Sequence, residues 1–193
     1  MRGIIAAIEA GELAAEARLA VSNRRDAPAL TFAAEHGVPI RVIPTMADPV
    51  AADEALAAAL QDAGVELVIL SGYLRKLGAA TLRAYAGRVL NVHPALLPKF
   101  GGPGMYGRRV HEAVAAAGET VTGVTVHVVD EAYDHGPVVA QLETPLSPGD
   151  DAAAIEAKVT AVESGFFVSV LRRICEGTLA LPKPPYTISD NLP

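Results

Sequence analysis

The sequence predicts an α/β fold: a single doubly wound, Rossmann-like, mostly parallel sheet with helices on both faces and an antiparallel extension. Short runs of β-forming residues alternate with helical segments through the first half of the chain. The run at 65–70, Val-Glu-Leu-Val-Ile-Leu, is the most continuous of these runs, which is typical of a central strand buried on both faces. Two further strand patterns flank an acidic loop late in the chain, where they can pair antiparallel.

Each element has its own local signal. Helices are predicted where apolar residues recur at helical spacing, often next to a capping residue or a glycine, at 1–10, 28–36, 48–60, 77–86, 108–117 and 150–175. Strands are predicted from runs of β-branched and other apolar residues at 18–22, 38–43, 65–70, 88–91, 120–129 and 137–144. The last helix has an apolar stripe that predicts core packing, formed by Ile155, Val159, Val162, Phe166, Phe167 and Val170.

Composition favours one folded domain over residues 1–182, followed by an irregular tail at 183–193. The chain has 193 residues, of which 51% are hydrophobic, enough to bury a sizeable core. A net charge of -6 without a dense basic run argues against nucleic-acid binding, and no apolar run is long enough to span a membrane. The single cysteine, Cys175, is expected in the core, and together with the lack of a signal pattern it predicts a cytoplasmic protein. No cysteine and histidine spacing suggests a metal site.

The segment 88–99 carries the strongest chemical signal. A strand pattern ends there in Asn91 and His93, and prolines then stop regular structure. Two residues of separation on an extended chain point both side chains to one side, where they could hold a carbonyl oxygen that becomes negative. An isolated pair of this kind more often satisfies loop backbone groups, so a third member is needed. Asp134, in the acidic loop between the last two strand patterns, is the predicted partner of His93.

These segments resemble the signature of the folate-dependent formyltransferases. The pattern N-x-H-P-x-L-L-P-K is met at 91–99 and V-D-E-x-x-D-x-G-P at 129–137, within a resemblance that runs from about residue 4 to about residue 176. The resemblance implies transfer of a formyl group from 10-formyltetrahydrofolate to the amine of glycinamide ribonucleotide, in purine biosynthesis. It implies small-molecule partners and no metal, nucleic acid or membrane, and it leaves open whether the chain is a monomer or a homodimer.

The same resemblance assigns roles to individual residues. Asn91, His93 and Asp134 are implied to be catalytic, while Pro94 and Glu163 are implied to contact the nucleotide, although Ser164 stands where many relatives have histidine. The folate is implied to contact Tyr73, Leu74, Arg75, Leu77, Asp130, Glu131 and Asp134.

Several of these positions also have ordinary structural explanations. From the residues alone, 71–77 could be a plain turn between a strand and a helix, and Glu163 an exposed helical residue. Thr125 and His127 point the same way along their strand, so they either support Asp134 from behind or pack across the strands. His111 is expected to be a solvated residue on its helix.

The beginning of the sequence departs from the resembled family. There, an opening strand and a small Gly/Ser/Asn phosphate-binding loop precede the segment that matches residues 1–4, so this chain is expected to be short by roughly ten residues or more. One alternative is therefore a catalytically silent, folate-binding fragment. Another is a deformylase-like hydrolase that uses water as the acceptor, although such enzymes usually carry an additional N-terminal domain.

Overall fold

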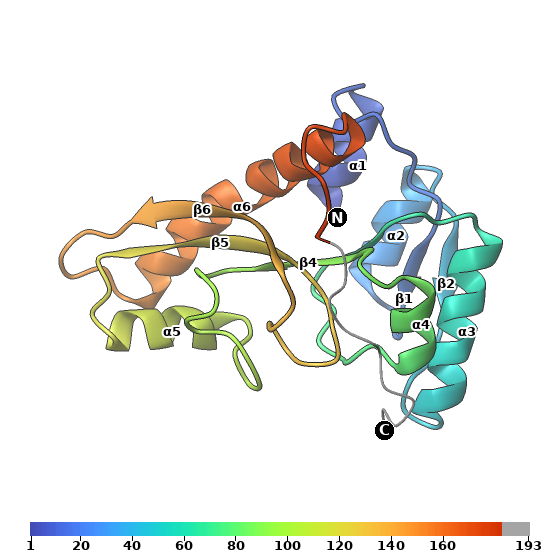
Figure 1. The fold of residues 1–193 in the computed structure, drawn as a ribbon, viewed down its shortest axis with the longest axis horizontal. Coiled ribbons are helices and arrows are strands. Elements are labelled where there is room, and N and C mark those ends of the chain that lie inside the picture. The colour runs from blue at the N-terminus through green and yellow to red at the C-terminus, as the bar shows by residue number, and fades with distance from the viewer. Residues whose placement is uncertain (183–193) are drawn as a thin grey trace.

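The computed structural model describes residues 1–182 and confirms an α/β fold; the tail predicted at 183–193 lies outside the described residues. Six strands form two sheets (Figure 1). One sheet pairs β1 (Ala20–Ser22) with β2 (Ile40–Val42) in parallel. The other has the order β3-β4-β5-β6, formed by β3 (Val68–Leu70), β4 (Val89–His93), β5 (Val121–Val128) and β6 (Val138–Pro145).

The expected antiparallel extension is confirmed. β3 and β4 run parallel, whereas β4 with β5 and β5 with β6 run antiparallel. The helices are α1 (Arg2–Glu9), α2 (Pro28–Glu35), α3 (Pro49–Asp62), α4 (Ala79–Ala84), α5 (Arg108–Ala116) and α6 (Ala152–Cys175). Asp48 and Asp151 begin α3 and α6 by accepting hydrogen bonds from the backbone N–H groups of Ala51 and Ala154, at 3.0 and 2.8 Å.

Helices cover both faces of the larger sheet. Successive side chains of β4 point to opposite faces, so each face packs against its own set of helices. Leu90 packs with Phe167 and Val170 of α6 and with Ala7 of α1. Its neighbour Val89 packs on the other face, in a cluster that also holds side chains of α3 and α4. The predicted stripe of α6 is confirmed as core packing, since most of its members are buried and the rest pack against the buried clusters.

The sheet is divided where the sequence predicted continuity. β1 and β3 are not hydrogen-bonded to each other, so the two sheets remain separate within residues 1–182. The strand predicted at the centre is instead an edge strand, reduced to Val68–Leu70 and only half-buried. Its apolar side chains match a central position, but it has a neighbouring strand on one side only.

Two further expectations from the sequence are wrong. His111 is buried rather than solvated, with 4% of its surface exposed, because α5 packs against α6 on the side that carries it. Cys175 is exposed, since it is the last residue of α6 and lies beyond the packed part of that helix.

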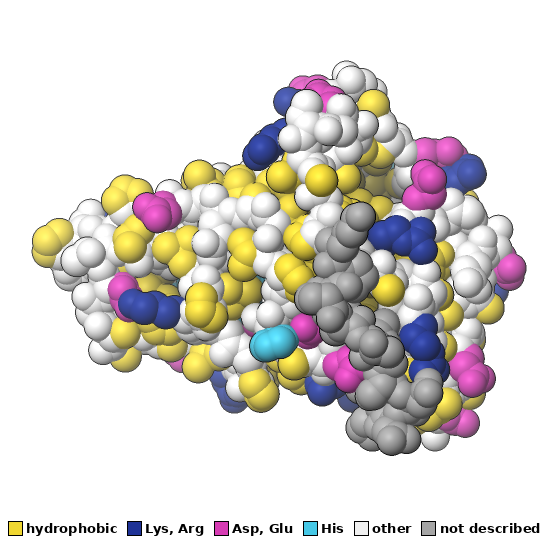
Figure 2. All heavy atoms as spheres, viewed as in Figure 1, with side chains coloured by type: hydrophobic (Ala, Val, Ile, Leu, Met, Phe, Trp, Pro, Cys, Tyr) yellow, Lys and Arg dark blue, Asp and Glu magenta, His cyan; other side chains and the backbone are white. Residues whose placement is uncertain are grey.

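Where described residues form the face drawn in Figure 2, no continuous basic band is seen. Lys and Arg side chains are dispersed there among acidic and neutral ones, in keeping with the net charge of -6. Among the described helices, none combines the length and the hydropathy needed to cross a membrane.

Candidate active site

Strand β4 presents two of the predicted site residues on one side. Asn91 and His93 are two positions apart, and the antiparallel register sets them opposite His127 and Thr125 of β5. Because directly opposed residues on one face lie close together, four polar side chains meet near the carboxyl end of β4. His93 and His127 are almost completely buried, with 3% and 2% of their surfaces exposed.

Asp134 reaches this group from the loop between β5 and β6. Its Oδ1 atom lies 3.4 Å from Nδ1 of His93 and 3.6 Å from Nε2 of His127. Its Oδ2 atom accepts a hydrogen bond from the Gly102 N–H at 3.0 Å, and its backbone has a φ of 53°. The left-handed conformation is one that aspartate tolerates better than most residues, so the loop can turn this carboxylate inward.

A glycine allows the loop to approach β5 closely. A Cβ atom added to Gly136 would lie 1.9 Å from the Val128 carbonyl oxygen, which is far inside van der Waals contact. No residue with a side chain fits there unless the backbone moves. Gly136 is therefore needed for the close approach of the loop to β5, in addition to the turn that it forms with Pro137.

The imidazole of His93 has protein partners on both nitrogens. Nε2 donates to the Phe100 carbonyl oxygen at 2.8 Å, while Nδ1 faces the Asp134 carboxylate at 3.4 Å. A neutral ring carries one proton and can donate at only one of these positions. His93 therefore has an acceptor facing each ring nitrogen, a carbonyl oxygen on one side and a carboxylate on the other.

The hydrogen bonds of His127 suit the neutral ring. Its Nδ1 donates to the Val128 carbonyl oxygen at 3.1 Å, so Nε2 is free to accept from the Asn91 amide nitrogen, also at 3.1 Å. Burial is the main cause that lowers the pKa of His127, and it favours the neutral ring. This contact orients the Asn91 amide and uses one of its two N–H groups, which leaves the second for a ligand.

Charge in the site is concentrated on Asp134. Burial opposes its ionisation, but hydrogen bonding and attraction to His93, the Gly102 N–H and the nearby His127 outweigh burial and lower the pKa of Asp134. The carboxylate is therefore ionised at neutral pH. A negative charge therefore lies 3.4 Å from the His93 ring.

Of the two roles left open for Thr125, its hydrogen bonds favour the one across the strands. Its buried hydroxyl donates to the Ala95 carbonyl oxygen at 2.7 Å and accepts from the Leu97 N–H at 3.0 Å. Gln141 of β6 adds a third hydrogen bond to the same hydroxyl at 2.9 Å. Thr125 thus fixes the loop that follows β4, whereas His127 lies directly beside the carboxylate and the amide.

The residues predicted to bind folate lie on two loops that meet. Lys76, which follows β3, places its ammonium 5.4 Å from the ring centre of Tyr133, the neighbour of Asp134. Tyr73 is half-buried, and burial raises the pKa of its hydroxyl, while Leu74 is 65% exposed.

The other predicted folate residues have varied surroundings. Leu77 is only 6% exposed and packs in the core with Leu60 and Leu82. Arg75 donates to the Met46 sulfur at 3.0 Å. Asp130 is half-buried, and its Oδ2 lies 2.8 Å from Nδ1 of the exposed His135; Glu131 is half-buried as well.

Glu163 is half-buried on α6 rather than exposed. Burial is the largest cause that raises its pKa, and the Met1 ammonium and His93 partly oppose the shift. The Met1 ammonium and His93 are thus both within electrostatic reach of the Glu163 carboxylate. Pro94 follows His93 directly and is half-buried as well.

Sequence reasoning did not find the contributions of Phe100, Gly102 and Gln141. Two of them act through backbone atoms, the Phe100 carbonyl and the Gly102 N–H, so no side chain marks their position. The glycines at 101 and 102 were a partial signal. A Cβ atom at Gly101 would come within 3.0 Å of the Asp134 Cβ, which shows how closely the two loops approach.

Comparison with known proteins agrees with this geometry. Residues 1–171 match the family model described as formyl transferase. The chain is 32% identical over 183 residues to phosphoribosylglycinamide formyltransferase of Haemophilus influenzae, covering 94% of this chain and 84% of the relative. It is 35% identical to the chloroplastic enzyme of that name from Vigna unguiculata, covering 91% of this chain. The chain spans only 57% of that plant relative's length.

The fold comparison gives a similar result. The structure of phosphoribosylglycinamide formyltransferase from Coxiella burnetii, in complex with CHES, superposes with a TM-score of 0.85 at 34% identity. The superposition covers 95% of this chain and 84% of that chain.

Proposed function

Because this chain belongs to the formyl transferase family, we propose that it transfers the formyl group of 10-formyltetrahydrofolate to the amine of glycinamide ribonucleotide. The observation that carries the proposal is the buried cluster of Asn91, His93 and Asp134, with the carboxylate 3.4 Å from the imidazole. The named activity of the Haemophilus and Coxiella relatives supports the choice of substrate.

The first step is attack of the amine nitrogen on the formyl carbon. A new carbon–nitrogen bond forms, the carbonyl oxygen becomes negative, and the bond to the folate nitrogen then breaks with its electrons going to that nitrogen. Acyl transfer of this kind is accelerated by donors aimed at the developing oxyanion. The free N–H of Asn91, held in place by His127, is the donor best oriented for it.

His93 supplies positive charge beside the same oxygen. In the described conformation its Nε2–H is bonded to the Phe100 carbonyl, so direct donation to the formyl oxygen requires that bond to be exchanged for the substrate. A charge-assisted hydrogen bond is stronger than a neutral one, which favours the exchange as the oxyanion forms.

Asp134 holds a water molecule that takes the proton from the attacking amine and passes a proton to the departing folate nitrogen, so the carboxylate ends as it began and no covalent enzyme intermediate is needed. The lowered pKa of Asp134 supports this role, because the carboxylate stays ionised near neutral pH.

The substrates are placed on two sides of this cluster. The pterin lies against the loop from Tyr73 to Leu77 and the loop from Asp130 to Asp134, which meet at the contact between Lys76 and Tyr133. The nucleotide lies toward Pro94 and Glu163. We assign residues 1–182 to this one catalytic domain and the reaction to the cytoplasm.

The test is an assay of the purified chain with 10-formyltetrahydrofolate and glycinamide ribonucleotide. Asn91→Ala, His93→Ala and Asp134→Ala are each expected to reduce turnover by on the order of 10²-fold or more, with unchanged circular dichroism. His36→Ala is the matched control. His36 also pairs with a carboxylate, that of Glu9, but both residues lie outside the cluster of Asn91, His93 and Asp134. The His36→Ala variant should therefore keep full turnover.

A silent folate binder is the second candidate, favoured by the break between β1 and β3. Calorimetry separates the two, because binding of a formyl-folate analogue without binding of glycinamide ribonucleotide supports the silent protein. Saturable formylation of the nucleotide excludes it. Release of formate in the absence of nucleotide would instead indicate a hydrolase that uses water.

A further inference from the structure

The loop between β3 and α4 depends on its neighbours for its shape. Residues 71–78 lie in neither a helix nor a strand. Backbone groups outside regular structure must find their hydrogen-bond partners elsewhere. The proposed folate contacts on this loop are Tyr73, Leu74, Arg75 and Leu77. Whatever fixes the loop therefore also shapes the surface offered to the folate.

Asp53 of α3 fixes the end of this loop. Its Oδ1 accepts a hydrogen bond from the Gly78 N–H at 3.0 Å, and its Oδ2 accepts from the N–H groups of Ala80 and Thr81 at 2.8 and 3.2 Å. The Thr81 hydroxyl donates in return to the Asp53 carbonyl oxygen at 3.3 Å. Hydrogen bonds in both directions therefore join one residue of α3 to the start of α4.

The residue before α4 cannot cap the helix itself. Gly78 stands at the N-cap position, where a side-chain oxygen usually accepts from the first turn, and glycine has no such oxygen. Asp53 takes this role from 25 residues away in the sequence. A Cβ atom at Gly78 would lie 2.5 Å from the Asp53 Oδ2 and 2.9 Å from its Cβ. The missing side chain at Gly78 is thus what lets the carboxylate come so close.

Both oxygens of the Asp53 carboxylate are used within the protein. Each of them faces backbone N–H groups, and the side chain is half-buried where α3 contacts α4. Hydrogen bonds to a charged acceptor are stronger than those between neutral groups. The geometry of Asp53 therefore suits a residue that holds the loop rather than one that contacts a substrate.

The loop leads from this anchor toward the catalytic cluster. Lys76 stands two residues before Gly78, and its ammonium lies 5.4 Å from the ring centre of Tyr133, on the acidic loop between β5 and β6. Burial, and after it the charge of Asp53, raise the pKa of the Tyr73 hydroxyl, so Tyr73 is within electrostatic reach of the carboxylate. A displaced Gly78 would therefore disturb the part of the loop on which the pterin is proposed to lie.

The side of the site proposed for the nucleotide is built from other elements. Pro94 follows β4, and Glu163 lies on α6. The hydrogen bonds of Asp53 go instead to residues 78–81. Loss of the Asp53 carboxylate should therefore affect the two substrates unequally.

We propose that Asp53 is a positioning residue for folate binding, whose carboxylate holds the loop at 73–78 in the shape that accepts the pterin, without contact to either substrate. This inference rests on the proposed formyl transfer from a folate. An ordinary helix cap would act differently, because it would stabilise α4 but leave the affinity for folate unchanged.

The experiment compares Asp53→Ala and Asp53→Asn with the unmodified chain. Asparagine keeps the size of the side chain and one acceptor oxygen, so this variant serves if Asp53→Ala does not fold. Asp53→Ala is expected to raise the KM for 10-formyltetrahydrofolate, and the Kd of an unreactive formyl-folate analogue, by on the order of 10-fold. Asp53→Asn should show a smaller rise. The kcat and the KM for glycinamide ribonucleotide should stay within about twofold.

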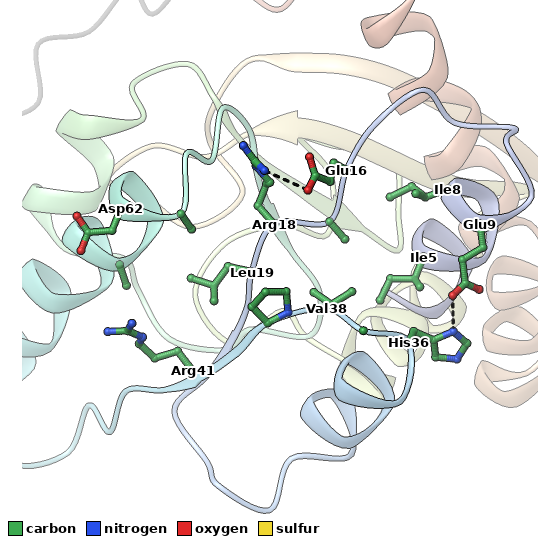
Figure 3. A pocket seen from close by; sticks show the side chains of 15 residues that line it. Ile5, Ile8, Glu9, Glu16, Arg18, Leu19, His36, Val38, Arg41 and Asp62 are labelled. Atoms are coloured by element: carbon green, nitrogen blue, oxygen red, sulfur yellow. Dashed lines mark hydrogen bonds and ion pairs between the residues drawn. The ribbon is translucent and has the colours of Figure 1, made fainter.

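The matched control is Asp62→Ala, at the end of the same helix. Asp62 lines a cavity of about 660 Å³ together with Leu19 and Arg41 (Figure 3). No described residue of the loop at 71–78 lines that cavity. The Asp62→Ala variant should therefore leave both KM values and the Kd of the analogue unchanged.

Two results would overturn the proposal. One is an equal rise of both KM values in Asp53→Ala, and the other is an unchanged Kd of the analogue beside a lower melting temperature, since Asp53 would then act on stability alone. The Kd is measured without turnover, so weaker binding of the analogue by Asp53→Ala supports the positioning role even if the unmodified chain does not formylate the nucleotide. An unmodified chain that binds no folate would refute both the positioning role and the proposed function.

Discussion

Replacing Asp134 with asparagine isolates the charge of the carboxylate from its shape. The side chain keeps its size and an oxygen able to accept from the Gly102 N–H, so the loop should retain its conformation. What is lost is the negative charge 3.4 Å from Nδ1 of His93. If that charge holds the protonated ring for oxyanion stabilisation, turnover should fall while substrate binding changes little.

The size of the effect follows from the separation of the charges. Two unit charges 3.4 Å apart attract by about 5 kcal/mol at an effective dielectric constant of about 20. The Asp134 side chain is 11% exposed, so solvent screens part of this attraction. A net loss of about 3 kcal/mol corresponds to a decrease in turnover on the order of 10²-fold.

The assay measures kcat and KM for formyl transfer between pH 5 and 9, with urea unfolding as a check on folding. Asp26→Asn is the control, because it removes the charge of a carboxylate that pairs with Arg24 on an exposed loop. Turnover of Asp134→Asn within threefold of the unmodified chain would refute the role of the charge. A large rise in KM at constant kcat would instead show that Asp134 acts mainly in binding.

Three further predictions concern the supporting structure. Thr125→Val leaves the hydrogen-bonding groups of Ala95, Leu97 and Gln141 without their shared hydroxyl and should lower the free energy of unfolding by about 3 kcal/mol in urea titrations. Gly136→Ala forces a Cβ atom against the Val128 carbonyl and should destabilise the chain by about 2 kcal/mol or more, with lower turnover; an unchanged unfolding midpoint would contradict this. Because the pKa of His127 is lowered by folding, the unfolded chain binds more protons below pH 6.5, so stability should fall as pH falls from about 6.5. His127→Gln should flatten that slope in melting curves.

The order of helices and strands could be predicted because its signals are local. Helices were predicted at 48–60 and 150–175, each beginning at an aspartate, and Asp48 and Asp151 act as caps in the structure. Sheet continuity could not be predicted in this way, since it depends on which strands become neighbours. The apolar run at 65–70 is the same whether a strand pairs with it on one side or on both.

Side-chain chemistry made part of the site predictable. Asn91, His93 and Asp134 were found because polar residues interrupt strand patterns at turns, and the structure brings them together. The buried position of His111 was missed because a histidine among charged neighbours on a short helix looks solvated. Packing of α5 against α6 decides its burial, and no local pattern reports that packing.

One loop links two of the catalytic candidates, His93 and Asp134. The segment from Ala95 to Gly102 is fixed by Thr125 at one end, bonds His93 through the Phe100 carbonyl, and bonds Asp134 through the Gly102 N–H. Because groups that share partners do not act independently, loosening this loop should disturb the imidazole and the carboxylate together. The double variant Thr125→Val with Asp134→Asn should therefore lose less activity than the product of the two single losses. Strict multiplication of those losses would show that the loop does not couple the two residues.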